Sequence, residues 1–170
     1  DTLGTAGILN CGATANNNVD IDQVDDMPTG CESDFMVSVT ATNAQDIRTF
    51  SGYGATTIDV GAPGDQVFTT QIGGGTGAAS GTSFASPLTA GIIGLLYSAP
   101  CSSMMDLVNA DPREGALYVR QALFNGVEQV GNLPGNCVTG GRVNSNNSLE
   151  WIMSNCGSCP APYNLNATND

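Results

Sequence analysis

The chain has 170 residues and a formal net charge of −12, with only four lysine and arginine residues and no histidine. This balance argues against nucleic-acid and anionic-membrane partners, because the cations that would neutralise phosphate groups are missing. The length suits one domain with a sizeable core, and the apolar segment 88–97 is too short to span a bilayer.

A buried strand is predicted near the N-terminus. Residues 7–13 are small and mostly apolar, as expected for a strand that is covered on both faces of a parallel sheet. The pattern breaks at Asn16, inside an Asn-rich segment. Taken alone, Asn16 is typical of a turn, and only its pairing with a second motif gives it another interpretation.

An acidic loop follows this strand and contains Asp20, Asp22, Asp25 and Asp26. Acidic residues in a loop are usually solvated, but carboxylate oxygens are also the ligands that calcium takes. The spacing matches no EF-hand. Two interpretations of the cluster therefore stay open, a solvated loop and a calcium site.

Two further strands are predicted in the middle of the chain. Residues 35–42 have β-strand composition and nearly alternate between larger and smaller side chains. Residues 67–70 form a second short strand, and a Gly-rich loop over residues 73–80 comes after it.

The string GTSFASP, residues 81–87, stands between that loop and the apolar segment 88–97. The pattern predicts that a flexible loop delivers Ser83 to the first turn of a buried helix. Free N–H groups and the positive dipole end of such a turn stabilise negative charge beside the hydroxyl. Ser83 is therefore a candidate nucleophile; the alternative is a helix N-cap, which is common for serine.

The C-terminal third reads as helical scaffold. Asp111 is suited to cap a helix that has Pro112 at its first position, and Gly126 is suited to end that helix. Asn147 with Glu150 is predicted to open a last helix. Residues 159–170 read as a linker that enters another module.

The six cysteines indicate structural disulfides and an oxidising compartment. Cys156 and Cys159 form a CxxC pair, but no second pair and no histidine is present to complete a zinc site. We expect Cys101 and Cys137 to reach one another or the 156–159 pair, and we expect Cys11 to stay free.

Three motifs in order resemble the subtilisin-like serine proteases over about residues 5 to 155. They are the strand with Asn16, the segments 50–54 and 58–64, and the string around Ser83. The resemblance implies an α/β fold with three layers and a mostly parallel sheet, incomplete in this chain. It also implies that residues 1–158 are the C-terminal portion of a catalytic domain. Residues 159–170 resemble the first strand of a fibronectin-like domain and are expected to be a linker and the start of such a module.

The resemblance assigns roles to the motif residues. Ser83 matches the nucleophile, Asn16 matches the side chain that donates a hydrogen bond to the oxyanion, and Thr82 supports them. The segment 13–15 matches the strand that lines the primary specificity pocket, in the order Ala13, Thr14 and Ala15, with glycine usual in the family at the last position.

Asp26 lies two residues before Pro28, which matches the pocket proline of the family. The match puts Asp26 at the base of the primary pocket, where its carboxylate would favour Arg or Lys at the P1 position of a substrate. The alternative is a solvated loop acid. No metal ligand set is predicted, no cofactor is required, and a structural calcium site is the one cation that the family resemblance leaves open.

In the family the triad runs Asp, His, Ser along the chain. We therefore expect the Asp and His to come from the N-terminal portion of the same catalytic domain, as a preceding segment or a partner chain. The expected activity is that of a secreted serine endopeptidase acting on protein or peptide substrates. The alternative is a pseudoprotease that keeps the fold for binding or regulation.

Overall fold

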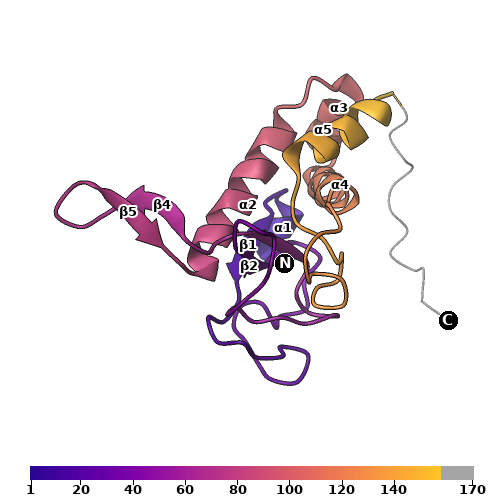
Figure 1. Cartoon of the computed structure of the whole chain (residues 1–170). Helices are drawn as coiled ribbons and strands as arrows, with labels where there is room; N and C mark the ends of the chain where they lie inside the picture. The colour runs from indigo at the N-terminus through magenta and orange to yellow at the C-terminus, as the bar shows by residue number, and fades with distance from the viewer. Residues whose placement is uncertain (158–170) are drawn as a thin grey trace.

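The computed structural model describes residues 1–157, so the predicted module over 159–170 and Cys159 lie outside the described residues. A parallel sheet in the order β1-β2-β3 lies at the centre (Figure 1). Its strands are β1 (Asn10–Ala13), β2 (Met36–Thr42) and β3 (Val60–Pro63). The first two confirm the strands predicted near the N-terminus and over residues 35–42.

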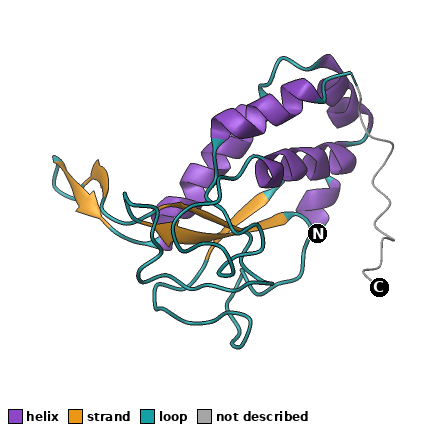
Figure 2. Ribbon diagram, turned by 45° about the vertical axis from the view of Figure 1, so that its right-hand side comes forward, coloured by secondary structure: helices purple, strands orange, loops and turns teal. Residues whose placement is uncertain are grey.

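All the larger helices lie on one side of this sheet, and long loops cover the other side (Figure 2). They are α2 (Thr82–Tyr97), α3 (Ser102–Ala110), α4 (Pro112–Asn125) and α5 (Ser145–Ser154); α1 (Thr2–Thr5) is a single turn. Residues 1–157 therefore carry one helical layer and a parallel sheet, two of the three layers that the family resemblance predicts.

The two faces of β2 differ in chemistry. Val37, Val39 and Ala41 are fully buried and join the main core with the helices. Ser38 and Thr40 point to the loops, where the Thr40 hydroxyl donates to the Gly52 carbonyl oxygen at 2.6 Å. The alternation within β2 thus gives one apolar face for helices and one hydroxyl-lined face that holds loops by hydrogen bonds.

The predicted start of α4 is confirmed. The Asp111 carboxylate accepts a hydrogen bond from the Glu114 N–H at 3.2 Å, and Pro112 is the first helical residue. The last helix begins earlier than predicted: Asn144 accepts from the Asn147 N–H at 3.1 Å and is the N-cap of α5. The prediction of Asn147 as the opening residue is wrong, because Asn144 offers the same capping amide three residues before it.

The Gly-rich stretch is more ordered than predicted. Residues Val67–Thr70 (β4) and Thr76–Ala79 (β5) pair in antiparallel fashion, so the predicted loop over 73–80 contains a strand. Gly73, Gly74 and Gly75 have φ values of 88°, 95° and 84°, a conformation that closes the hairpin and that other residues rarely adopt. The hairpin projects from the body of the molecule (Figure 1).

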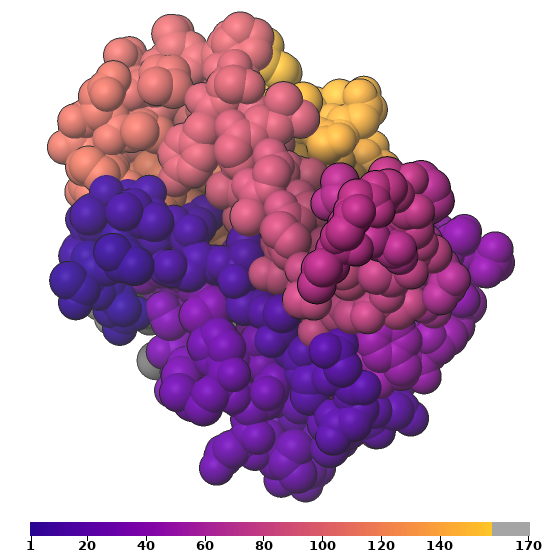
Figure 3. All heavy atoms as spheres, turned by 90° about the vertical axis from the view of Figure 1, so that its left-hand side faces the viewer, coloured from indigo at the N-terminus to yellow at the C-terminus, as the bar shows by residue number. Residues whose placement is uncertain are grey.

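One outward face of α2 carries apolar residues with no cover among residues 1–157. Leu88 is 38% exposed and Leu95 is 44% exposed, and a Cβ added to Gly91 or Gly94 would meet no atom within 4 Å. Residues 88, 91 and 95 lie on one side of the helix because of its 3.6-residue repeat. Figure 3 shows this part of α2 at the surface, between the N-terminal residues and the hairpin.

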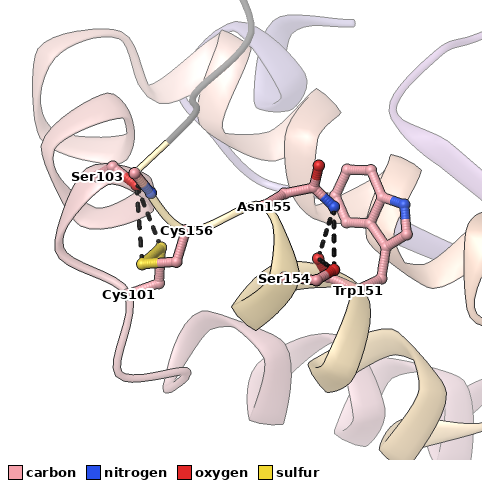
Figure 4. The surroundings of a disulfide bond; sticks show 7 residues. Cys101, Ser103, Trp151, Ser154, Asn155 and Cys156 are labelled. Atoms are coloured by element: carbon pink, nitrogen blue, oxygen red, sulfur yellow. Dashed lines mark hydrogen bonds between the residues drawn. A yellow bond between two sulfur atoms is a disulfide. The ribbon is translucent and has the colours of Figure 1, made fainter.

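A disulfide joins Cys101 to Cys156 and ties the start of α3 to the end of α5 (Figure 4). This confirms that Cys101 reaches the 156–159 pair. Within residues 1–157 Cys137 has no disulfide partner, so the prediction that it reaches Cys101 or Cys156 is wrong: Cys101 and Cys156 pair with each other and Cys137 is buried elsewhere. Cys11 is free there, as predicted. Among residues 1–157 no single helix is long and apolar enough to cross a membrane; α2 and α3 pass such a test only together, and they are bent by 105°.

We expect residues 1–157 alone to behave as an incomplete domain. Among these residues β1 pairs only with β2, so its outer edge is open, and α2 exposes the apolar face described above. The isolated chain should bind a hydrophobic dye, associate at micromolar concentration and unfold without a sharp transition. A cooperative, monomeric melt without dye binding would contradict this expectation.

Candidate functional site

Ser83 is the second residue of α2, and its side chain is exposed. The N-cap of the helix is Gly81, so the alternative that Ser83 is the cap is wrong. The Gly81 N–H donates to the Gly64 carbonyl oxygen at 2.8 Å and anchors the turn. Within the described residues the Ser83 N–H has no acceptor, which leaves a donor beside the hydroxyl at the positive end of the helix dipole.

Asn16 lies next to this turn, three residues beyond the end of β1. Its Oδ1 accepts hydrogen bonds from the Thr82 N–H at 2.9 Å and from the Thr82 hydroxyl at 3.1 Å. A backbone N–H can only donate, so the amide oxygen must face α2. The NH₂ group of Asn16 is thereby directed away from Thr82 and has no acceptor within residues 1–157.

Gly81 marks the place where the two candidate groups meet. A Cβ on Gly81 would lie 3.0 Å from Ser83 Oγ and 3.8 Å from Asn16 Oδ1. The hydroxyl and the amide oxygen therefore both lie close to one small residue, although 66 positions separate Asn16 from Thr82 in the sequence. A larger residue at Gly81 would press against the Ser83 hydroxyl.

Thr82 is buried, with 1% of its surface exposed. Its hydroxyl donates to the Thr14 carbonyl oxygen at 2.5 Å and lies against Asn16 Oδ1. Thr82 thus connects the start of α2 to the chain that leaves β1.

The remaining predicted residues lie along the same stretch of chain. Ala13 ends β1 and is half-buried. The Thr14 hydroxyl and the Ala15 N–H both donate to Asp26 Oδ2, at 2.8 and 3.1 Å. The structure therefore brings the predicted pocket strand and Asp26 together; whether this carboxylate contacts a substrate stays a prediction.

Two of the other acids of the loop, Asp20 and Asp22, have local partners. Asp22 accepts hydrogen bonds from the N–H and hydroxyl groups of both Thr56 and Thr57, at 2.8 to 3.2 Å. Burial opposes the ionisation of Asp22, but these hydrogen bonds outweigh it and lower the pKa of its carboxyl. Among residues 1–157 no group of three or more His, Cys, Asp or Glu side chains could hold a metal ion. A calcium site stays a prediction without a ligand set here.

A buried ion pair was not anticipated from the sequence. Asp59 is 7% exposed, accepts from the Ser38 N–H at 2.7 Å and lies 3.4 Å from the guanidinium of Arg120. Burial raises the pKa of the Asp59 carboxyl. The pair lines a polar cavity of about 340 Å³ next to residues 29–34. The available signal was Arg120 itself, one of only four basic residues, which follows the apolar run 116–119.

Among residues 1–157 no general base accompanies Ser83. The sequence contains no histidine, and within the described residues no side chain forms a hydrogen bond with Ser83 Oγ. The arrangement therefore offers a hydroxyl and two hydrogen-bond donors suited to an oxyanion, without the group that would remove a proton.

The family model that matches residues 3–140 is described as the subtilase family. Among curated proteins, the chain is 38% identical over 98 residues to alkaline serine protease ver112 of Corniculantispora psalliotae, covering 56% of this chain and 24% of that protein. It is 34% identical over 125 residues to proteinase R of Parengyodontium album, covering 73% and 29%. The chain thus spans less than a third of the length of these relatives.

Solved structures share the fold. The A-subunit of an AB5 toxin from E. coli matches with a TM-score of 0.68 at 18% identity, covering 89% of this chain and 53% of the toxin subunit. The self-cleaved protease domain of PatA matches with a TM-score of 0.62 at 25% identity, covering 86% and 50%. In both cases the chain corresponds to about half of the solved chain.

The hydroxyl of Thr82 should matter for stability. Thr82→Val leaves the buried carbonyl of Thr14 without its donor, and the free energy of unfolding should fall by about 1–3 kcal/mol. Thr82→Ser, which keeps the hydroxyl, should lose less, and Ser83→Ala at the exposed neighbour should change stability by about 0.5 kcal/mol or less. Chemical denaturation of the protein together with its expected N-terminal portion measures all three; equal losses for the valine and serine variants would contradict the role of the hydroxyl.

Proposed function

Because this chain belongs to the subtilase family, we propose that it supplies the nucleophile and the oxyanion donors of a serine endopeptidase. The observation that carries the proposal is the meeting of Ser83 Oγ and the Asn16 amide beside Gly81. A helix start alone would not carry it, since serine is common there.

Each group has a defined part in the reaction. Ser83 Oγ attacks the carbonyl carbon of the scissile peptide bond, and its proton passes to a histidine base. The oxyanion of the tetrahedral intermediate then accepts hydrogen bonds from the Ser83 N–H and from Asn16 Nδ2. The base returns the proton to the leaving amine, the C–N bond breaks, and water later hydrolyses the acyl ester on Ser83.

Asn16 is suited to this part because its orientation is set before a substrate binds. Its Oδ1 is held by the N–H and the hydroxyl of Thr82 at 2.9 and 3.1 Å. The NH₂ group therefore needs no rotation when negative charge develops, and donors that are fixed in advance stabilise a transition state best.

The base and its aspartate are proposed to come from the N-terminal portion of the same catalytic domain. The absence of histidine and the coverage of about half of the solved relatives support this. The outward face of α2 is the surface that this portion would cover. It begins at Leu88, little more than one helical turn after Ser83, and continues through Gly91 to Leu95, where glycine allows close packing.

The proposed setting is extracellular, with proteins or peptides as substrates and no required cofactor. The Cys101–Cys156 disulfide supports an oxidising compartment. A structural calcium ion would be bound through oxygen ligands that residues 1–157 do not gather into one cluster.

A pseudoprotease is the second candidate, and the lack of histidine is the observation that favours it. Such a protein would keep Ser83 on the fold and use the surface for binding. Labelling of the serine separates the two candidates.

A fluorophosphonate probe tests the function directly. The chain alone should react slowly, because nothing removes the Ser83 proton, and it should react on Ser83 at a protease-like rate once the Asp- and His-bearing portion is present. Intact mass and peptide sequencing measure the label. Fast labelling of the isolated chain would contradict the divided triad, and no labelling of the complete protein would favour the pseudoprotease.

Asn16→Ala in the complete enzyme should lower kcat by roughly 10²–10³-fold, a magnitude taken from the removal of such a donor in a subtilisin. KM should change little, because the donor acts on charge that develops in the transition state. Ser83→Ala should cost more, and the double variant should be little worse than Ser83→Ala. A large loss of stability with unchanged kcat would instead make Asn16 a structural turn residue.

A further inference from the structure

One oxygen of the Asp26 carboxylate accepts several hydrogen bonds. Three hydrogen-bond donors meet on one of its oxygens, Oδ2: the Thr14 hydroxyl at 2.8 Å, the Ala15 N–H at 3.1 Å and the Thr29 hydroxyl, which makes the shortest contact. Two of these donors belong to the chain that leaves β1, and the third belongs to the loop that carries Asp26. The oxygen therefore joins the loop to the strand end.

The loop is also packed onto β1. A Cβ added to Gly12 would lie 3.0 Å from Thr29 Cγ2 and 3.3 Å from Pro28 Cγ, so the loop approaches the strand as closely as glycine permits. The turn is closed by the Gly30 N–H, which donates to the Asp26 carbonyl oxygen at 2.5 Å. The Asp26 carboxylate thus holds, by hydrogen bonds, a loop that packs closely against β1.

The hydrogen bonds of Asp26 connect it to the turn that carries Ser83. Thr14 donates its hydroxyl to Asp26, and its carbonyl oxygen accepts from the Thr82 hydroxyl. Thr82 in turn holds Asn16 Oδ1, next to Ser83. One set of hydrogen bonds therefore runs from Asp26 through Thr14 and Thr82 to Asn16, and a shift at Asp26 would move the proposed oxyanion donor.

The same geometry limits what Asp26 can do for a basic substrate residue. A guanidinium binds a carboxylate best through two parallel hydrogen bonds, one to each oxygen. Oδ2 already accepts from three neutral donors, so both oxygens are not available together.

We propose that Asp26 is a positioning residue, which holds the pocket strand and through it Asn16, and that it does not select Arg or Lys at P1. The part that concerns catalysis rests on the proposed function. The neighbouring Asp25 is exposed and makes none of these contacts, so it offers a matched control.

Kinetics of the complete enzyme separate positioning from substrate selection. Asp26→Ala, Asp26→Asn and Asp25→Asn are compared on peptides that differ only in P1, which is Arg, Lys or Leu. Asp26→Ala should lower kcat at least tenfold for every P1 with little change in KM. Asp26→Asn, whose amide oxygen still accepts from Ala15, should recover most of kcat and keep the P1 ratios within about twofold.

Asp25→Asn should behave as the wild type. A tenfold or greater loss of Arg and Lys preference in Asp26→Asn, with the Leu peptide cleaved as before, would overturn the proposal. Equal kcat for Asp26→Ala and the wild type would overturn it as well.

A second readout does not depend on activity. Hydrogen exchange of peptides covering residues 12–18 is measured in the complete protein on a Ser83→Ala background. Asp26→Ala should speed exchange at Ala15, whereas Asp26→Asn and Asp25→Asn should leave it protected; unchanged protection in Asp26→Ala would overturn the proposal. If the wild type shows neither peptidase activity nor labelling of Ser83, the proposed function fails, and the exchange data still decide whether Asp26 positions the strand.

Discussion

The site depends on one hydrogen bond, from the Thr82 N–H to Asn16 Oδ1 at 2.9 Å. It joins the chain after the carboxyl end of a strand to the amino end of a helix. In a parallel α/β fold, hydrogen-bond donors at these two ends point into the same solvent-filled crevice. It also fixes the direction of the Asn16 amide, because only the oxygen can face the N–H. Its Oδ1 and the Ser83 hydroxyl both lie near Gly81, and the NH₂ group is directed away from Thr82.

The second constraint is the unequal cover of the sheet. The helices bury Val37, Val39 and Ala41 on one face, and loops bind the hydroxyls of the other face. Among residues 1–157 the outer edge of β1 and the outward side of α2 stay open. The open edge belongs to the strand that leads to Asn16, and the exposed side of α2 begins little more than one helical turn after Ser83. An element that covered both would therefore lie near the nucleophile.

Local rules explain what could be predicted. The start of α4 follows from Asp111, Pro112 and Glu114, residues that interact within one turn. The string around Ser83 correctly predicted a helix start at this position. Strand β5 was missed because Thr76–Ala79 has no strand pattern of its own and is held by pairing with β4.

Longer-range features lay outside such rules. Asn16 meets Thr82 across 66 positions, and Arg120 meets Asp59 across 61. A sequence motif could suggest that Asn16 and Ser83 act together, but not that Thr82 orients the amide. The hydrogen-bond partners of Asp26 could not be predicted from the sequence either, because they depend on how the loop over residues 26–30 packs against Gly12.

In the proposed enzyme, an element packed on the outward face of α2 completes the site at Ser83. Gly91→Leu tests it most directly, with Gly91→Ala and with Asn109→Leu on α3 as controls. Nothing lies within 4 Å of a Cβ at Gly91, so in the chain alone either change should be tolerated and should favour the helix by up to about 1 kcal/mol. In the complete protein, Gly91→Leu should abolish fluorophosphonate labelling of Ser83, Gly91→Ala should have a smaller effect, and Asn109→Leu should be labelled normally. Labelling of Gly91→Leu at the wild-type rate would contradict the claim.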